Sequence, residues 1–163
     1  MTDIKIIKES VNVQGISQEI QRIIKRFPGQ NQISLQSNNP SPIPETDWNC
    51  SVGKFSDISG LELDYIHPIF PEAKLINHYL KEFDLYRSRI MINHSKECMT
   101  IHKDPSPRVH IPVISNENCL MIIDNYAHYL PPGKIYWTDT RKSHTAMNGS
   151  YEKRIHIVGC VTK

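Results

Sequence analysis

Short β-like runs separated by turn residues dominate the second half of this chain, and they constrain its fold more than any other feature. From Tyr86 onward eight such runs follow one another at close spacing. Turn-forming pairs such as Asp124-Asn125 and Pro132-Gly133 lie between them. The runs are 86–93, 98–104, 108–114, 119–123, 126–130, 134–138, 144–148 and 154–161. Eight short strands at this spacing predict a mainly β fold, a double-sheet jelly roll or barrel.

Two amphipathic helices are predicted before the strands. Residues 16–27 carry apolar side chains at helical spacing and are followed by Pro28-Gly29, a stop signal. A second helix is expected to begin near Pro71, because proline suits the first helical position. Each helix has one apolar face that needs a partner. We therefore expect both helices to support one sheet of the barrel.

The chain is expected to form a single domain, residues 1–163. A length of 163 residues is enough for one real hydrophobic core. Within it, residues 1–85 are predicted to supply helical support and loops, and residues 86–161 the β-barrel core. The proline-rich stretch from Ser37 to Asp47 reads as a surface loop. An inert connector is the preferred interpretation of that loop, and a lid over a pocket is the alternative.

Charge and cysteine content argue against several classes of protein. The formal net charge is +2 and the basic residues are scattered, so neither nucleic acid nor a membrane is an expected partner. Residues 1–13 show no signal-peptide or membrane-spanning run, which predicts a cytoplasmic protein. The four cysteines form no Cys-x-x-Cys pair, so reduced thiols are expected rather than a zinc ribbon or disulfide scaffold.

The triplet His102-Lys103-Asp104, with His144 and Arg154 further on, speaks most directly about chemistry. Residues at i and i+2 of an extended strand project to the same side, so His102 and Asp104 can converge on one point. Two imidazoles and one carboxylate can bind iron(II) and leave positions open for a co-substrate and O₂. A guanidinium can hold the carboxylate of a keto acid by two hydrogen bonds. These residues predict an oxygenase.

Two of the predicted strands alternate apolar side chains with basic ones. In residues 108–113, Arg108 and His110 share one face and valine or isoleucine occupies the other. The last strand repeats this pattern with Arg154 and His156. A barrel covered outside by helices would turn these polar side chains toward a cavity. Desolvated cations in such a cavity need an anionic occupant.

The order of motifs along the strands resembles a known family. The matching segments are I-H-K-D (101–104), R-V-H-I-P-V (108–113), P-G-K-I-Y-W-T-D (132–139), H-T-A-M-N (144–148) and R-I-H-I-V (154–158). They are similar to the aspartyl/asparaginyl β-hydroxylase-like branch of the iron(II)- and 2-oxoglutarate-dependent oxygenases. The resemblance covers roughly residues 86–161.

The resemblance implies a double-stranded β-helix with a defined site. His102, Asp104 and His144 would hold Fe(II), and Arg154 would pair with the distal carboxylate of 2-oxoglutarate. Arg108 and His110 match a family segment that helps to hold the same co-substrate. Some family members lack the carboxylate ligand, whereas Asp104 is present here.

The family often has a Pro-Gly turn before the first histidine, where this chain has His94-Ser95-Lys96-Glu97. His128 and His156 compete with His144 for the role of third ligand, and His128 is interpreted as structural. Further residues are candidates for the mouth of the cavity, where they would select the substrate. They are Arg87, Arg89, Asn93, His94 and Trp48.

The predicted function is that of a 2-oxoglutarate-dependent dioxygenase using Fe(II) and O₂. It would hydroxylate a C–H bond of an amino acid, or of an Asp, Asn or Pro-type residue in a peptide or protein. One alternative is a cupin-type metal enzyme that does not use 2-oxoglutarate. The other is a non-catalytic barrel that binds a ligand without turnover.

Overall fold

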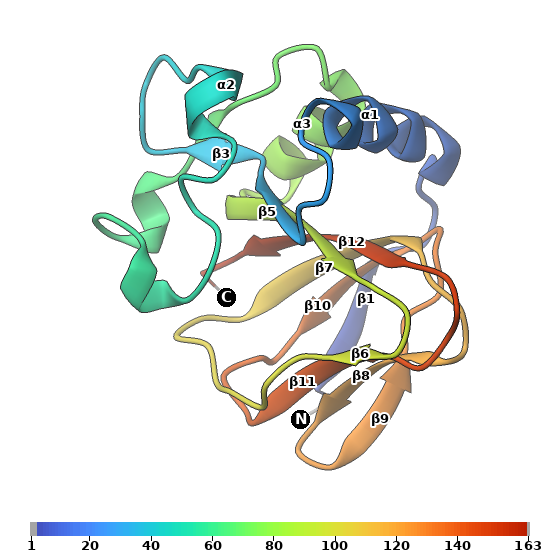
Figure 1. Ribbon diagram of the computed structural model, residues 1–163. Coiled ribbons are helices and arrows are strands. Elements are labelled where there is room, and N and C mark those ends of the chain that lie inside the picture. The colour runs from blue at the N-terminus through green and yellow to red at the C-terminus, as the bar shows by residue number, and fades with distance from the viewer. Residues whose placement is uncertain (1–2, 163) are drawn as a thin grey trace.

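Two facing antiparallel sheets form the body of the molecule in the computed structural model, which describes residues 3–162. The larger sheet has the order β1 (Ile4–Lys8), β10 (Ile135–Thr138), β7 (Arg108–Ile114), β12 (Arg154–Cys160), β5 (Tyr86–Asn93) and β2 (Gln32–Ser34). The smaller has the order β6 (Glu97–Cys98), β11 (His144–Asn148), β8 (Cys119–Ile123) and β9 (Tyr126–Tyr129). A separate pair joins β3 (Gln36–Ser37) to β4 (His67–Pro68). The prediction of a mainly β jelly roll is confirmed (Figure 1).

Seven of the eight predicted runs form strands whose ends lie within one residue of expectation. The run 98–104 differs, because only Glu97–Cys98 is a regular strand and an open loop follows. Pro105 and Pro107 have no N–H group to offer to a ladder. After Cys98, which pairs with Met147 of β11, the run forms one further bridge to that strand, between His102 and His144.

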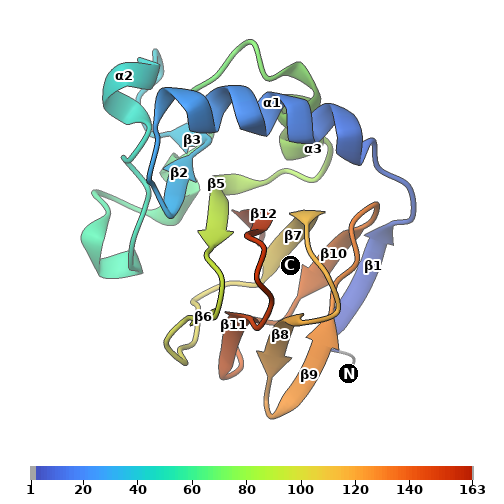
Figure 2. The ribbon, with the colours of Figure 1, turned by 45° about the vertical axis from the view of Figure 1, so that its right-hand side comes forward.

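Helices cover the outer face of the larger sheet, as expected (Figure 2). They are α1 (Val13–Arg26), α2 (Pro44–Asp47) and α3 (Lys74–Glu82), with 3₁₀ turns η1 (Phe55–Asp57) and η2 (Glu62–Asp64). The first begins earlier than predicted because Asn12 caps it, its side chain accepting from Gly15 N at 2.9 Å. The last begins at Lys74 rather than near Pro71, which lies in the turn before it.

The main hydrophobic core lies between α1, α3 and the outer face of the larger sheet. Ile16 and Ile20 of α1 and Ile76 of α3 are fully buried there, together with Ile111 and Ile157 of the central strands. Burying each such side chain contributes about 1.5–3 kcal/mol. The alternate residues of the same strands point between the two sheets, where the site lies.

Two strands of the larger sheet come from residues 1–85, the part of the chain that was predicted to supply only helices and loops. β1 pairs with β10 and β2 pairs with β5, so the larger sheet begins and ends on N-terminal segments. Within β1, Ile6 and Ile7 are both exposed, so the segment lacks the alternation that would have marked it as a strand.

Across residues 3–162, no helix combines the length and the apolar character needed to cross a bilayer.

Candidate metal centre

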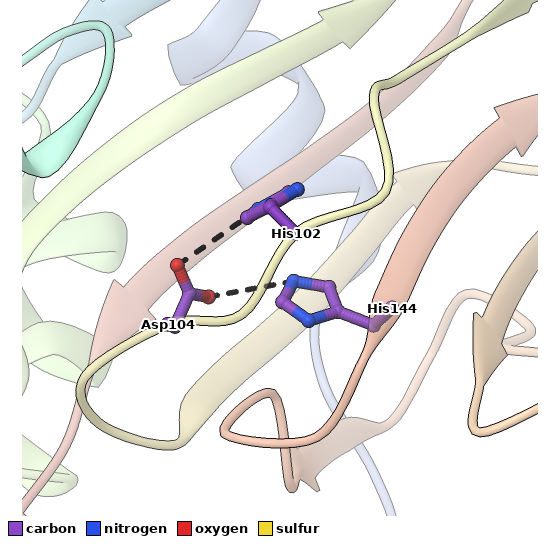
Figure 3. A group of neighbouring side chains, drawn as sticks. All are labelled: His102, Asp104 and His144. Atoms are coloured by element: carbon purple, nitrogen blue, oxygen red, sulfur yellow. Dashed lines mark ion pairs between the residues drawn. The ribbon is translucent and has the colours of Figure 1, made fainter.

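His102, Asp104 and His144 meet at one point between the two sheets (Figure 3). His102 and Asp104 come from the loop after β6, and His144 is the first residue of β11. The Asp104 carboxylate lies 3.9 Å from His102 Nε2 and 3.5 Å from His144 Nε2. One potential ligand atom from each residue lies within 4.8 Å of the other two. The three side chains selected from the sequence are therefore brought together.

Backbone carbonyls orient both imidazole rings. His102 Nδ1 lies 2.7 Å from the Thr100 carbonyl oxygen, and His144 Nδ1 lies 2.9 Å from that of Lys142. Each Nδ1–H donates to its carbonyl, so the lone pair of each Nε2 faces Asp104. Burial lowers the pKa of His144, which favours the neutral, metal-binding form. Both rings therefore present Nε2, the nitrogen left to bind a metal, toward Asp104.

Arg108 holds Asp104, the candidate carboxylate ligand. Its Nη2 lies 3.2 Å from Asp104 Oδ1 and 3.1 Å from Glu62 Oε1, and its Nη1 donates to Ser106 Oγ at 2.6 Å. The prediction that Arg108 helps to hold a co-substrate stays a prediction. In the structure this guanidinium joins Asp104 to the rest of the fold.

Sequence reasoning missed Glu62, the buried carboxylate of η2. Its Oε1 accepts hydrogen bonds from Arg87 Nη1 at 2.5 Å and from Arg108 Nη2 at 3.1 Å. The Cys160 thiol lies 3.6 Å from the same oxygen. Glu62 thus compensates two buried cations at once and, through Arg108, restrains Asp104.

Arg154 lies at the start of β12 with only 2% of its surface exposed. Among residues 3–162 its Nε has no hydrogen-bond partner and its guanidinium forms no ion pair. Its Nη2 donates to His156 Nδ1 at 3.1 Å, and His110 Nδ1 lies 3.4 Å from the same nitrogen. Burial lowers the pKa of Arg154 to about 10, so it stays charged at neutral pH.

Both neighbouring histidines are neutral. Burial, reinforced by the Arg154 charge, lowers the pKa of His110 and of His156 well below the usual value. The Nε2 atom of each has no partner among the described residues. This part of the barrel therefore holds one cation and several unused polar atoms, which together suit an anionic ligand.

A cavity of about 950 Å³ joins these groups. It is lined by the three candidate metal ligands and by Arg108, His110 and Arg154. Arg87, Arg89 and Asn93 also line it, as was considered from the sequence. Trp48 does not: it stacks on Phe27 in the helical layer, with ring centroids 5.2 Å apart.

Two histidines that competed for the third ligand position lie elsewhere. His128 belongs to β9, the edge strand, where it pairs with Met121 of β8. His156 lies in the barrel beside Arg154 rather than with His102 and Asp104. His94 contacts Asn31, its Nε2 lying 2.8 Å from the amide oxygen. The geometry favours His144 as the third ligand.

Comparison with protein families identifies the family of this chain. The family described as aspartyl/asparaginyl beta-hydroxylase matches residues 11–162. The chain belongs to the aspartyl/asparaginyl β-hydroxylase family. The resemblance seen in the strand motifs is thus confirmed, and it extends through the N-terminal half. A search of curated proteins gives no match.

Solved structures agree on the fold of this β-hydroxylase family member. AviO1 from Streptomyces viridochromogenes Tue57 superposes with a TM-score of 0.54 at 13% identity, over 98% of this chain and 90% of that one. A nickel complex of ThoJ, described as a non-heme monooxygenase, gives 0.51 at 11% identity, over 96% and 72%. A cupin domain from Bordetella pertussis Tohama I covers 47% of this chain and 81% of its own, with a TM-score of 0.42 and 13% identity.

Membership of the hydroxylase family, together with the His-Asp-His cluster, supports a metal-dependent oxygenase.

Proposed function

We propose that this chain is an Fe(II)- and 2-oxoglutarate-dependent dioxygenase. It hydroxylates a C–H bond of an amino acid, either free or as an Asp, Asn or Pro-type residue in a peptide or protein. One observation carries the proposal: three metal-type ligand atoms converge in a cavity whose wall also holds the buried guanidinium of Arg154, which forms no ion pair among residues 3–162. A metal centre alone would not require that cation.

The donor set fits iron(II). Two neutral imidazole nitrogens and one carboxylate are the ligands that non-heme oxygenases use, and they leave positions open for a keto acid and O₂. The backbone bonds to both Nδ1 atoms fix the rings, and Arg108 fixes Asp104. His102, Asp104 and His144 would hold the ion.

The second carboxylate of 2-oxoglutarate is complementary in charge to the Arg154 guanidinium. A 2-oxoglutarate molecule carries a second carboxylate away from its keto acid, and Arg154 would bind that group by charge-assisted hydrogen bonds. His156 orients the guanidinium by accepting from its Nη2. The neutral His110 lines the same cavity and offers its unpartnered Nε2.

Bound iron and O₂ would supply the oxidation, coupled to conversion of 2-oxoglutarate to succinate and CO₂. The protein contributes positioning: Arg154 orients the co-substrate, and the Glu62–Arg108 pair keeps Asp104 in place. Arg154, His110 and His156 are buried between the facing sheets, which strengthens the charge interactions of this part of the cavity.

Succinate release from 2-oxoglutarate tests the proposal. We expect release that requires Fe(II) and O₂, is accelerated by a substrate, and is lost in His144→Ala and Arg154→Gln. Matched controls are His78→Ala and Arg22→Gln, which remove exposed side chains of α3 and α1.

Two results would overturn the proposal. Iron-dependent oxidation of a substrate without 2-oxoglutarate would indicate a cupin-type metal enzyme. Ligand binding with no turnover under any condition would indicate a binding module.

A further inference from the structure

A second buried guanidinium in the cavity, that of Arg89, has no carboxylate partner within residues 3–162. Arg89, on β5, is 7% exposed and lines the same cavity as the candidate metal ligands. Its Nη1 donates to Gln32 Oε1 at 3.2 Å and to the Gly53 carbonyl oxygen at 3.3 Å, both neutral acceptors. Among residues 3–162 its Nε has no partner. The mechanism proposed above does not use this side chain.

The neighbouring arginines do not share this condition. Arg87 and Arg108 both donate to the Glu62 carboxylate, and Arg108 also reaches Asp104. The Glu62 carboxylate pairs with these two arginines and not with Arg89. Burial, and then the charge of Arg87, lower the pKa of Arg89 to about 10, so it remains a cation at neutral pH.

Arg89 and Arg154 serve different parts of the cavity. On the paired strands β5 and β12, Arg89 lies opposite Val158, whereas Arg154 lies opposite Asn93. Four residues of strand separate the two positions, about 13 Å along the sheet. Arg89 donates toward β2 and the Gly53 loop, and Arg154 donates toward His156. One co-substrate carboxylate therefore satisfies Arg154 and leaves Arg89 unpaired.

The net charge of the site with metal and 2-oxoglutarate bound also favours a further carboxylate beside Arg89. Four buried arginines on β5, β7 and β12 line the cavity, and the carboxylates of Glu62 and Asp104 pair with only two of them, Arg87 and Arg108. A divalent metal ion and the dianion 2-oxoglutarate would cancel each other. Two positive charges then remain among these buried guanidinium groups, where an uncompensated charge is costly.

We propose that Arg89 binds the carboxylate of the prime substrate, which is therefore a small free carboxylic acid, of the amino-acid class, rather than a residue inside a polypeptide. The identification of this acid as the substrate rests on the proposed function. An internal residue of a peptide has amide groups where a free amino acid has its main-chain carboxylate. Only an Asp residue still offers an anion, from its side chain, and the main-chain amide of aspartate used below as a probe distinguishes that case. The inference thus selects one of the two substrate classes left open above.

Binding without turnover tests the proposal. The wild-type protein is loaded with Zn(II), which cannot support oxidation, and with 2-oxoglutarate. The probes are the common L-amino acids and the primary amide of each. Thermal shift selects an amino acid that binds, and calorimetry then measures its affinity and that of its amide. We expect the acid to bind at least about tenfold more tightly than its amide.

Variants assign the effect to one side chain. Arg89→Gln should lower the affinity for the amino acid about tenfold or more and change that for 2-oxoglutarate less than about twofold. Arg154→Gln should do the reverse. Arg22→Gln on the exposed face of α1 is the matched control and should change neither. Should Arg89→Gln fail to fold, the comparison of acids with amides in the wild-type protein still decides.

Distinct results overturn the inference and the proposed function. Equal binding of acids and amides, no binding of any amino acid, or loss of 2-oxoglutarate binding in Arg89→Gln would each contradict the role of Arg89. Amino-acid binding that depends on Arg89, in a protein that does not bind 2-oxoglutarate, would leave the carboxylate site standing and refute the proposed reaction.

Discussion

Glu62 shows how a single residue can act on a metal site that it does not touch. Its carboxylate fixes Arg108, which in turn holds Asp104. Replacing Glu62 by Gln keeps the shape but removes the charge, so Asp104 loses part of its restraint. We expect about tenfold weaker binding of Zn(II) or Fe(II), the usual effect of removing an outer partner of a ligand. Calorimetric titration of the ion measures this.

The matched control is Glu117→Gln, at an exposed loop position. It should leave the affinity for the ion unchanged. Equal affinity in Glu62→Gln and wild type would show that Asp104 is positioned without Arg108.

His156 gives the stability a definite pH dependence. Burial lowers its folded-state pKa well below 6.5, whereas the unfolded chain titrates near 6.5. As the pH falls below 6.5 the unfolded state takes up a proton that the folded state refuses. The free energy of unfolding therefore decreases toward acid, by at most about 1.4 kcal/mol per pH unit for this residue.

Urea unfolding between pH 7 and pH 5 measures this slope. His156→Gln should make the decrease shallower, and His78→Gln, which removes an exposed histidine, should leave it unchanged. A wild-type slope that both variants share would mean that His156 is not the group responsible.

The candidate ligands could be predicted from the sequence because they belong to a motif, whereas Glu62 belongs to none and was missed. His102, Asp104 and His144 stand out because metal ligands need fixed types at fixed spacing. Glu62 lies in a 3₁₀ turn forty or more residues before these ligands, among residues that resemble any surface loop. Its burial arises only when that turn folds against β5 and β7.

Among the secondary-structure elements, α3 depends on a residue of another helix. No side chain of its own caps its first turn. Instead the Glu19 carboxylate of α1 accepts from Leu75 N at 3.0 Å and Ile76 N at 2.9 Å. This satisfies two backbone donors and places a negative charge at the positive end of the helix.

Glu19→Ala should lower the free energy of unfolding by about 1–2 kcal/mol, because both donors lose their acceptor. Chemical denaturation measures the change. Gln18→Ala, on the exposed side of α1, should alter it by less than about 0.5 kcal/mol. Equal stability of the two variants would mean that water replaces Glu19 without loss.

Regular strands were predictable and irregular ones were not. β5, β7 and β12 have apolar outer faces against the helices, so their pattern marks them. β1 shows no such face and joins the sheet only by pairing with β10. The loop after β6 departs from its predicted strand, and it carries two candidate ligands.

At the scale of the whole molecule, the buried arginines of the cavity repel one another when no anion is bound. Anions that enter it should stabilise the protein, because binding to the folded state alone shifts the unfolding equilibrium. With Zn(II) bound, 2-oxoglutarate at a hundred times its dissociation constant should add about 2.7 kcal/mol to the free energy of unfolding.

Thermal melting with and without 2-oxoglutarate measures this. Arg154→Gln should abolish the stabilisation, and Arg22→Gln should keep it. An equal shift in Arg154→Gln would indicate that another cation binds the co-substrate.

The association of metal, co-substrate and protein in one site is tested most directly by absorbance under anaerobic conditions. Iron(II) and 2-oxoglutarate are added to the wild-type protein and to His144→Ala. We predict a charge-transfer band between iron(II) and the keto acid in the wild type, absent without 2-oxoglutarate and lost in His144→Ala. No band in the wild type, or a band at full strength in His144→Ala, would contradict this assignment of the site.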